Sequence, residues 1–259
     1  MQKFFCNPKR RFAPVLVRTF LSSKERSFGY NRSIALGCNF TKCLVVLFGL
    51  LVFSPGKVYS QEKNFQIVRL KYNGGSDWYN DPSAEVNLLK YLNAKTGIKV
   101  NPEYKFADVS SDEIFSYPFL FLTGHGYINF SEKDVERLKK YIENGGFLYI
   151  DDDYGLDKAV RRELKRIFPD QPLVELPFNF PLYHILFDFP SGPPKTHEHD
   201  GKPPRGFGIF NGNRLAVYYT YESNPSDGWA DPEVHHDSEE KRIEALKFGV
   251  NIVLFALTR

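Results

Sequence analysis

The hydrophobic positions of this chain fall into short apolar runs separated by amphipathic segments. Residues 119–122 (FLFL) and 147–150 (FLYI) are apolar runs of strand length, and the segment between them carries apolar residues at helical spacing from Ser131 onward. Ser131 is a capping residue type, and Gly145 and Gly146 follow the last apolar position of that helix. This order predicts two parallel strands joined by a crossover helix.

The same alternation continues over the chain from residue 65. We expect further strands at residues 65–72, 98–109, 173–176, 206–210 and 214–221, and further helices after Asp81, at residues 156–168 and from about Glu239. Asp81 is expected to cap its helix with Pro82 at the first position, and Asn211-Gly212 is expected to form a two-residue hairpin turn. The pattern indicates an α/β fold in which the strands at residues 65, 119 and 147 are parallel neighbours in a mostly parallel sheet covered on both faces.

Residues 1–60 differ from the rest of the chain. They contain ten Lys or Arg against one acid, Glu25, followed by an apolar run at residues 43–53 and a small-residue boundary at Ser60. This order predicts a secretory signal that is removed after Ser60. An uncleaved anchor is one alternative, and a true start further downstream in the gene is another. We expect residues 61–259 to be a single exported domain, periplasmic or extracellular, that meets the membrane only transiently through the signal.

Removal of the leader changes the charge of the protein. The whole chain has 34 basic and 31 acidic residues, and subtracting the ten and the one in the leader leaves 24 and 30, a net charge near −6. The net negative charge of the domain therefore gives no reason to expect that it binds nucleic acid. The three cysteines, Cys6, Cys38 and Cys43, also lie in the leader, so the domain has neither a disulfide nor a thiol.

Polar residues follow two of the expected parallel strands. His125 closes the first, between Gly124 and Gly126, and Asp151, Asp152 and Asp153 close the second. Carboxyl ends of neighbouring parallel strands open onto one crevice, where ligands bind. His125, Asp151 and Asp152 are the candidate catalytic residues, and Asp152 and Asp153 are candidate ligand contacts. The alternatives are a structural His125 and carboxylates that cap the next helix, because at most two of three successive residues face the crevice.

The loop after the strand at residues 65–72 is a second candidate binding segment. Gly74 and Gly75 offer backbone amides for an anion, and Asp77, Trp78 and Tyr79 follow them. The spacing is not that of a dinucleotide or P-loop motif, and no cofactor is indicated. Exposed aromatic rings here are suited to stacking on a sugar. The alternative, that Trp78 packs under the helix it precedes, is slightly favoured.

Histidines in the later loops are candidate metal ligands. His197 and His199 form an HxH pair, and His235 and His236 precede the last helix. Imidazoles bind transition metals, but no third ligand lies near the HxH pair in sequence. A solvated loop is the favoured interpretation for both pairs.

Four segments resemble a known bacterial family. SDWYNDP, YPFLFLTGHG, IENGGFLYIDDD and FGVNIVLFAL are similar in sequence and order to domain of unknown function 4159, over roughly residue 65 to the C-terminus. That family resembles the class I glutamine amidotransferase-like superfamily, which implies a flavodoxin-like three-layer α/β/α sandwich. One departure is that Phe180-Pro181 stands where the resemblance implies a His-Pro pair.

Glutaminase chemistry of that superfamily needs a thiolate on a sharp turn after a strand. The domain has no Cys, the equivalent turn runs from Thr123 to Gly126, and no Gly-x-Ser-x-Gly elbow replaces it. Thr123 is the one alternative nucleophile at that turn. Amidotransferase activity is therefore not expected.

Two classes of function stay open. The first, which we favour, is a non-catalytic module of the cell envelope that binds a small polar ligand, such as a glycan, or an envelope protein. The second is a hydrolase that uses His125 with a carboxylate of residues 151–153, with a divalent metal holding the water as one version of it.

Overall fold

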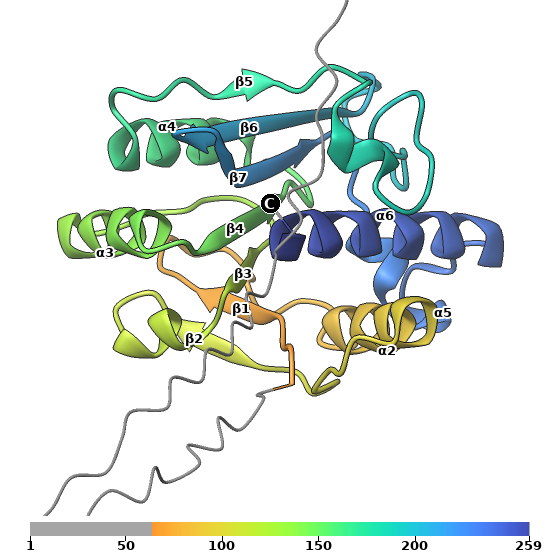
Figure 1. Cartoon of the computed structure of the whole chain (residues 1–259). Helices are drawn as coiled ribbons and strands as arrows, with labels where there is room; N and C mark the ends of the chain where they lie inside the picture. Colours follow the sequence, from red (N-terminus) through yellow and green to blue (C-terminus); the bar gives the residue numbers. More distant parts are fainter. Residues whose placement is uncertain (1–63, 259) are drawn as a thin grey trace, which may run out of the picture. The chain divides into compact units, whose positions relative to one another are not determined.

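Residues 64–258 of the computed structural model are described, and the leader prediction lies outside them. The strands are β1 Val68–Lys71, β2 Phe106–Asp108, β3 Phe119–Leu122, β4 Phe147–Asp151, β5 Val174–Glu175, β6 Arg205–Asn211 and β7 Arg214–Tyr221. The α-helices are α2 Ala84–Thr96, α3 Glu132–Glu143, α4 Asp157–Ile167, α5 Pro232–His235 and α6 Glu239–Thr258, with 3₁₀ turns η1 Asp112–Ser116, η2 Pro181–His184 and η3 Asp227–Trp229. Figure 1 shows their arrangement.

The strands form one mixed, mostly parallel sheet in the order β2-β1-β3-β4-β7-β6-β5. β1 pairs with β3 in parallel, and β3 pairs with β4 in parallel with Leu120 opposite Leu148. The predicted parallel neighbours are therefore confirmed. β7 continues the parallel part beside β4, whereas β6 and β5 add an antiparallel edge.

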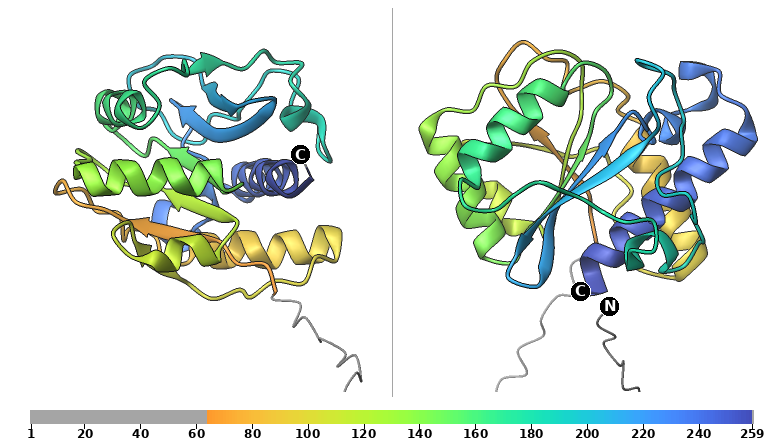
Figure 2. Two further views of the ribbon diagram at one scale, coloured as in Figure 1. Left: turned by 60° about the vertical axis from the view of Figure 1, so that its left-hand side comes forward. Right: turned by 90° about the horizontal axis from the view of Figure 1, so that it is seen from above.

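Helices cover both faces of the sheet. α3 and α4 lie on one face and α2 and α6 on the other, as the views in Figure 2 show. Each face has its own apolar core: Leu138 of α3 packs with Leu120 of β3, and Leu88 of α2 and Phe248 of α6 pack with Phe121 on the other side. The central strand β3 is apolar throughout, as are the first four residues of β4, because both faces of the sheet are buried there.

Two local predictions are wrong. Asp81 does not cap α2; it has a positive φ of 45°, and α2 begins after Ser83. The hairpin turn is shifted by one residue, because Asn211 pairs with Arg214 and leaves Gly212 and Asn213 as the turn. By contrast, α3 begins as predicted, with Ser131 and Asp134 forming a reciprocal capping box.

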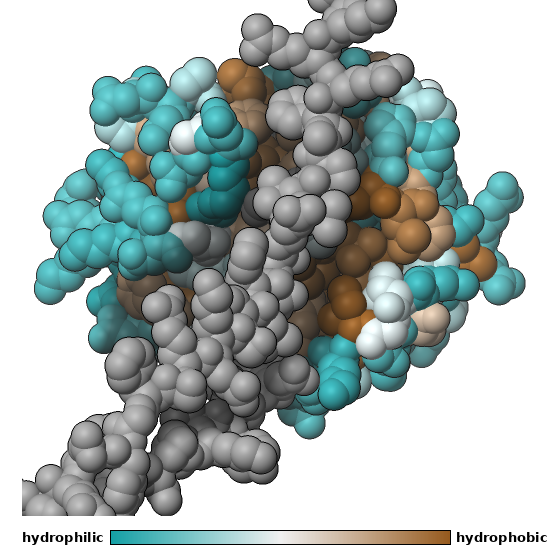
Figure 3. All heavy atoms as spheres, in the orientation of Figure 1, coloured by the Kyte–Doolittle hydropathy of each residue, from teal (hydrophilic) through white to brown (hydrophobic). Residues whose placement is uncertain are grey.

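The surface around the C-terminus separates polar from apolar residues. On the face shown in Figure 3, hydrophobic residues gather on the α6 side and hydrophilic residues on the side of α3 and α4. Within residues 64–258, none of the helices has both the length and the apolar content needed to cross a membrane.

Candidate functional site

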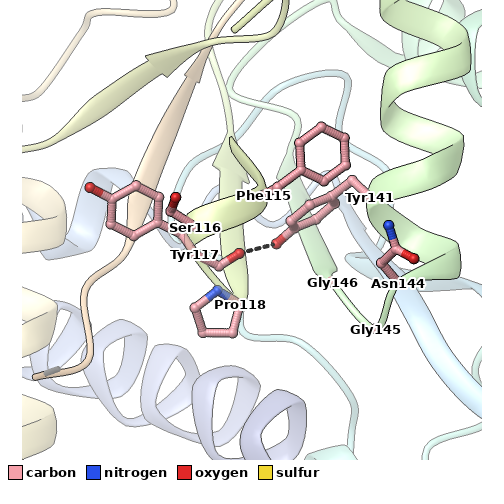
Figure 4. Close-up of a pocket in the computed structure, with 8 residues that line it drawn as sticks. All are labelled: Phe115, Ser116, Tyr117, Pro118, Tyr141, Asn144, Gly145 and Gly146. Atoms are coloured by element: carbon pink, nitrogen blue, oxygen red, sulfur yellow. Dashed lines mark hydrogen bonds between the residues drawn. The ribbon is translucent and has the colours of Figure 1, made fainter. Parts of the chain in front are cut away.

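A small pocket lies at the amino ends of β3 and β4 (Figure 4). It has a volume of about 320 Å³, and its central polar group, the Tyr141 hydroxyl, donates to the carbonyls of Tyr117 at 3.1 Å and Phe147 at 3.2 Å. Gly146 leaves room for that ring, because a Cβ there would lie 2.3 Å from it. These contacts connect backbone segments, and they offer no acid, base or nucleophile.

The polar cavity lies at the opposite edge, where the parallel strands end. Its volume is about 460 Å³. Nine residues line it: His125, Asp153, Tyr154, His197, Glu198, His199, Asn224, Asp227 and His235. Four histidines, three acids and no lysine or arginine make this the candidate site. It combines residues that follow β3, β4 and β7 with the long loop before β6.

His125 is held by two carboxylates. Asp77 accepts hydrogen bonds from the His125 backbone N–H at 2.6 Å and from ring Nδ1 at 2.9 Å. Asp153 Oδ2 lies 3.3 Å from the same Nδ1. No hydrogen bond from the described residues holds the other ring nitrogen, Nε2, and the side chain is 51% exposed. Because Nδ1–H faces carboxylates, the neutral ring presents Nε2 to the cavity as a proton acceptor.

A buried ion pair fixes the loop that carries Asp77. The Arg69 guanidinium of β1 binds both oxygens of Glu85 in α2, at 2.5 and 2.7 Å, and also donates to the carbonyls of Trp78 and Asn80. The Asn80 side chain in turn donates to Asp153. The sheet, α2 and this loop are therefore connected to the carboxylates around His125.

Asn224 connects the two halves of the cavity. Its side-chain Nδ2 donates to Asp153 Oδ1 at 2.9 Å and to Asp227 Oδ2 at 2.7 Å. Two buried oxygens nearby, Asn224 Oδ1 and Asp227 Oδ1, have no hydrogen-bond partner among the described residues. A buried acceptor without a partner costs free energy, so these atoms favour a partner from outside the chain.

The second half of the cavity is a cluster of His197, Asp227 and His235. His197 Nδ1 lies 2.6 Å from Asp227 Oδ2, and His235 Nε2 lies 3.8 Å from Asp227 Oδ1. One ligand atom from each of the three lies within 4.8 Å of the others. Two further acids contact the rings. Asp237 lies 2.9 Å from His197 Nε2, the nitrogen that does not face Asp227, whereas Asp81 lies 2.9 Å from His235 Nε2, the same nitrogen that faces Asp227.

The environment shifts the pKa values of the cavity residues. Burial and, second, the charge of Asp227 raise the pKa of Asp153 to about 7. Burial alone would lower the pKa of His125, but Asp153 and Asp77 outweigh it and raise that pKa. Burial lowers the pKa of His199. Asp153 is therefore able to exchange a proton near neutral pH.

Two of the three predicted aspartates do not line the cavity. Asp151 still belongs to β4 and is fully buried, and it accepts hydrogen bonds from Thr220 Oγ1 at 2.5 Å and from the Ser226 N–H at 2.9 Å. Asp152 accepts from the Leu156 N–H at 2.9 Å, at the start of α4. The helix-capping alternative therefore describes Asp152, and only Asp153 faces His125.

The glycine-aromatic loop contributes Asp77 alone. Gly74 packs on the backbone of Tyr127, Gly75 does not line the cavity, and Trp78 packs on the core and on Phe106 with ring centroids 5.2 Å apart. Tyr79 is exposed and packs edge-on against Trp78. The predicted anion cradle and stacking platform are not part of the cavity.

Thr123 is no accessible nucleophile. It is 1% exposed, and its Oγ1 is buried without a hydrogen-bond partner among the described residues. The cavity lining contains neither serine, threonine nor cysteine. Covalent catalysis by a serine, threonine or cysteine therefore has no candidate among the residues that line the cavity.

A comparison with known protein families identifies the family of this chain. The family model for Domain of unknown function (DUF4159) matches residues 66–257. The chain belongs to this family. A search of curated proteins finds no match. All nine residues of the cavity lie within the span that this DUF4159 model covers.

The sequence interpretation missed part of the site. His197 and His199 both line the cavity, but only His197 belongs to the cluster, together with His235 and the unpredicted Asp227. His235 was expected in a solvated loop, and its side chain is 25% exposed. The sequence did contain a signal that this loop is packed against the domain: the apolar residues Trp229 and Ala230 lie in a polar segment close to Asp227. In the structure both are fully buried.

Proposed function

We propose that this domain is a hydrolase that acts on a small polar substrate with water as the nucleophile. The observation that carries the proposal is the position of His125, whose Nδ1 faces Asp77 and Asp153 while Nε2 is left for the cavity. A histidine oriented by a carboxylate is the arrangement that general bases use. The lining offers no serine, threonine or cysteine, which supports water as the nucleophile.

The proposed step follows from these contacts. Nε2 of neutral His125 takes a proton from a water molecule as the water oxygen forms a bond to the electrophilic carbon or phosphorus of the substrate. The imidazolium that results is stabilised by Asp77 and Asp153. The bond to the leaving group then breaks, and the proton on His125 passes to that group, so the neutral base is regenerated.

The test is a panel of chromogenic esters, amides, phosphoesters and glycosides with wild-type protein and His125→Asn. We expect the variant to lose activity by about 100-fold or more, the usual contribution of a general base. His184→Asn is the matched control, because His184 also pairs with an aspartate, Asp188, but lies outside the cavity. Equal activity of His125→Asn and wild type would refute the proposal.

A non-catalytic module is the second candidate, and one observation favours it. Tyr154, at the edge of the cavity, is 53% exposed and packs edge-on against His199 at 5.3 Å. An exposed ring beside polar groups is suited to a sugar. If wild type cleaves no member of the panel but oligosaccharides raise its melting temperature, binding without catalysis replaces hydrolysis.

We also propose that the domain works outside the cytoplasm and has a flavodoxin-like sandwich related to class I glutamine amidotransferases. Export is supported by the basic and apolar pattern of residues 1–60. The fold relation is supported by the parallel strand order β2-β1-β3-β4-β7, which is the flavodoxin order when the antiparallel strands are set aside. N-terminal sequencing of native protein should begin near Gln61, and an intact leader would contradict cleavage.

A further inference from the structure

We propose that His197, Asp227 and His235 bind a divalent transition-metal ion of the same chemical class as Zn²⁺. Two imidazoles and one carboxylate are the protein ligands of one common catalytic zinc site, which keeps a further position for water or substrate. The three residues come from the loop before β6, from η3 and from α5. Metal binding stands independently of catalysis, whereas a role for the metal in holding the attacking water rests on the proposed function.

Two of the three distances between ligand atoms are short enough for a single ion, and the third, between the two imidazole nitrogens, is at most 4.8 Å. His197 Nδ1 and Asp227 Oδ2 are 2.6 Å apart, and His235 Nε2 and Asp227 Oδ1 are 3.8 Å apart. Two atoms bonded to one zinc ion at about 2.1 Å lie no more than about 4.2 Å apart. The two imidazole rings lie with centroids 5.1 Å apart and an interplanar angle of 68°.

Asp227 gives a second, independent reason to expect a cation. Its side chain is 4% exposed, Asn224 donates only to Oδ2, and the buried Oδ1 has no hydrogen-bond partner among the described residues. A buried carboxylate oxygen without a partner is costly. A metal ion bonded to Oδ1 would be the partner that this oxygen lacks.

The surroundings favour a cation over an anion. Asp81, Asp153 and Asp237 lie around the cluster, and the cavity lining has no lysine or arginine. Outside the lining, Lys241 lies 3.8 Å from Asp237. Asp237 also binds His197 Nε2, which leaves Nδ1 directed at Asp227. A carboxylate behind a ligating histidine fixes ring orientation and raises the basicity of the ligand.

The test is Zn²⁺ titration by calorimetry, with full-length protein purified without a histidine tag and stripped with a chelator. We expect one ion per chain in wild type. His235→Ala and Asp227→Asn should each weaken binding by more than about 100-fold, and Asp237→Asn, outside the ligand set, by about 10–100-fold. His184→Ala is the matched control and should bind as wild type does, since this exposed histidine lies outside the cavity.

Equal Zn²⁺ affinity of wild type and a folded His235→Ala or Asp227→Asn would overturn the proposal. If both variants have a lowered melting temperature and do not stay folded, wild-type protein provides the test. Zn²⁺ must then raise the melting temperature of wild type above its value in chelator, and the absence of a rise would overturn the proposal. His125→Asn should bind Zn²⁺ as wild type does while losing hydrolysis. Zn²⁺ binding without any hydrolysis would leave the metal site standing and remove the hydrolase.

Discussion

The buried pair Arg69–Glu85 offers the sharpest test of how the fold supports the cavity. Both side chains are at most 1% exposed, and the guanidinium meets the carboxylate in a two-bond arrangement. It also lies 4.8 Å from the centroid of the Phe121 ring. Because burial removes water from both ions, each depends on the other for its charge partner.

We expect Glu85→Gln to lower the free energy of unfolding by about 3–5 kcal/mol, the cost of leaving one ion of a buried pair without its partner. Gln keeps the shape of the side chain but removes the negative charge and one of the two acceptors that Arg69 uses. For a domain with a total stability of roughly 5–15 kcal/mol, this loss is large. Urea unfolding followed by tryptophan fluorescence measures it, since Trp229 is buried in the core.

Glu175→Gln is the matched control. It breaks the pair of Glu175 with Arg205, whose side chains are 45% and 47% exposed and 3.1 Å apart. An exposed pair of this kind contributes less than about 1 kcal/mol. A loss below about 1 kcal/mol in Glu85→Gln, or an equal loss in both variants, would refute the argument from burial.

Three further predictions concern the pH dependence and local packing of the domain. Burial raises the pKa of Asp151 from its ordinary value of 3.8 to about 7. The folded state therefore keeps the proton to higher pH than the unfolded state does, and stability should fall as pH rises from about 4 to 7. In urea titrations with chelator present, the free energy of unfolding of Asp151→Asn should lack this decrease, which is on the order of 4 kcal/mol in wild type. If the free energies of wild type and variant change in parallel with pH, the prediction is refuted. Gly146→Ala should cost about 1–3 kcal/mol in urea unfolding, because its Cβ meets the Tyr141 ring, and an unchanged midpoint would contradict this. Ser131→Ala should cost about 1 kcal/mol by the same assay through loss of the capping box on α3, and no loss would mean that the cap contributes nothing.

The central fold could be predicted because its signals are local. The central strands β3 and β4 begin as short apolar runs, and α3 has its cap, its apolar face and its terminal glycine in sequence. The turn after β6 was placed one residue early because an Asn-Gly pair also fits a strand end followed by a Gly-Asn turn. The predicted cap at Asp81 is wrong because the sequence does not reveal the positive φ of this residue or its contact with His235.

The candidate site was predicted only where it lies next to a strand. His125, Asp77 and Asp153 follow β3, β1 and β4, and strand ends meet at one edge. Which of three successive aspartates turns inward depends on where β4 stops, and the sequence does not fix that point. Asp227 and His235 reach the cavity through the irregular loop after β7. In that loop neither hydrophobic periodicity nor residue spacing predicts which side chains they contact.

The departure at Phe180 bears on the chemistry through its position. The resemblance to the family implied a His-Pro pair where this chain has Phe180-Pro181. The Phe180 ring packs on Phe210 near the β6–β7 turn, with centroids 6.1 Å apart, and on Phe255 of α6 at 5.4 Å. That turn precedes β7, whereas the cavity residues follow its other end, and Phe180 is not among them. A histidine at this position would sit among aromatic rings at the wrong edge of the sheet. Its absence therefore removes no acid, base or ligand from the cavity, and the case for hydrolysis rests on His125 and the two carboxylates that face it.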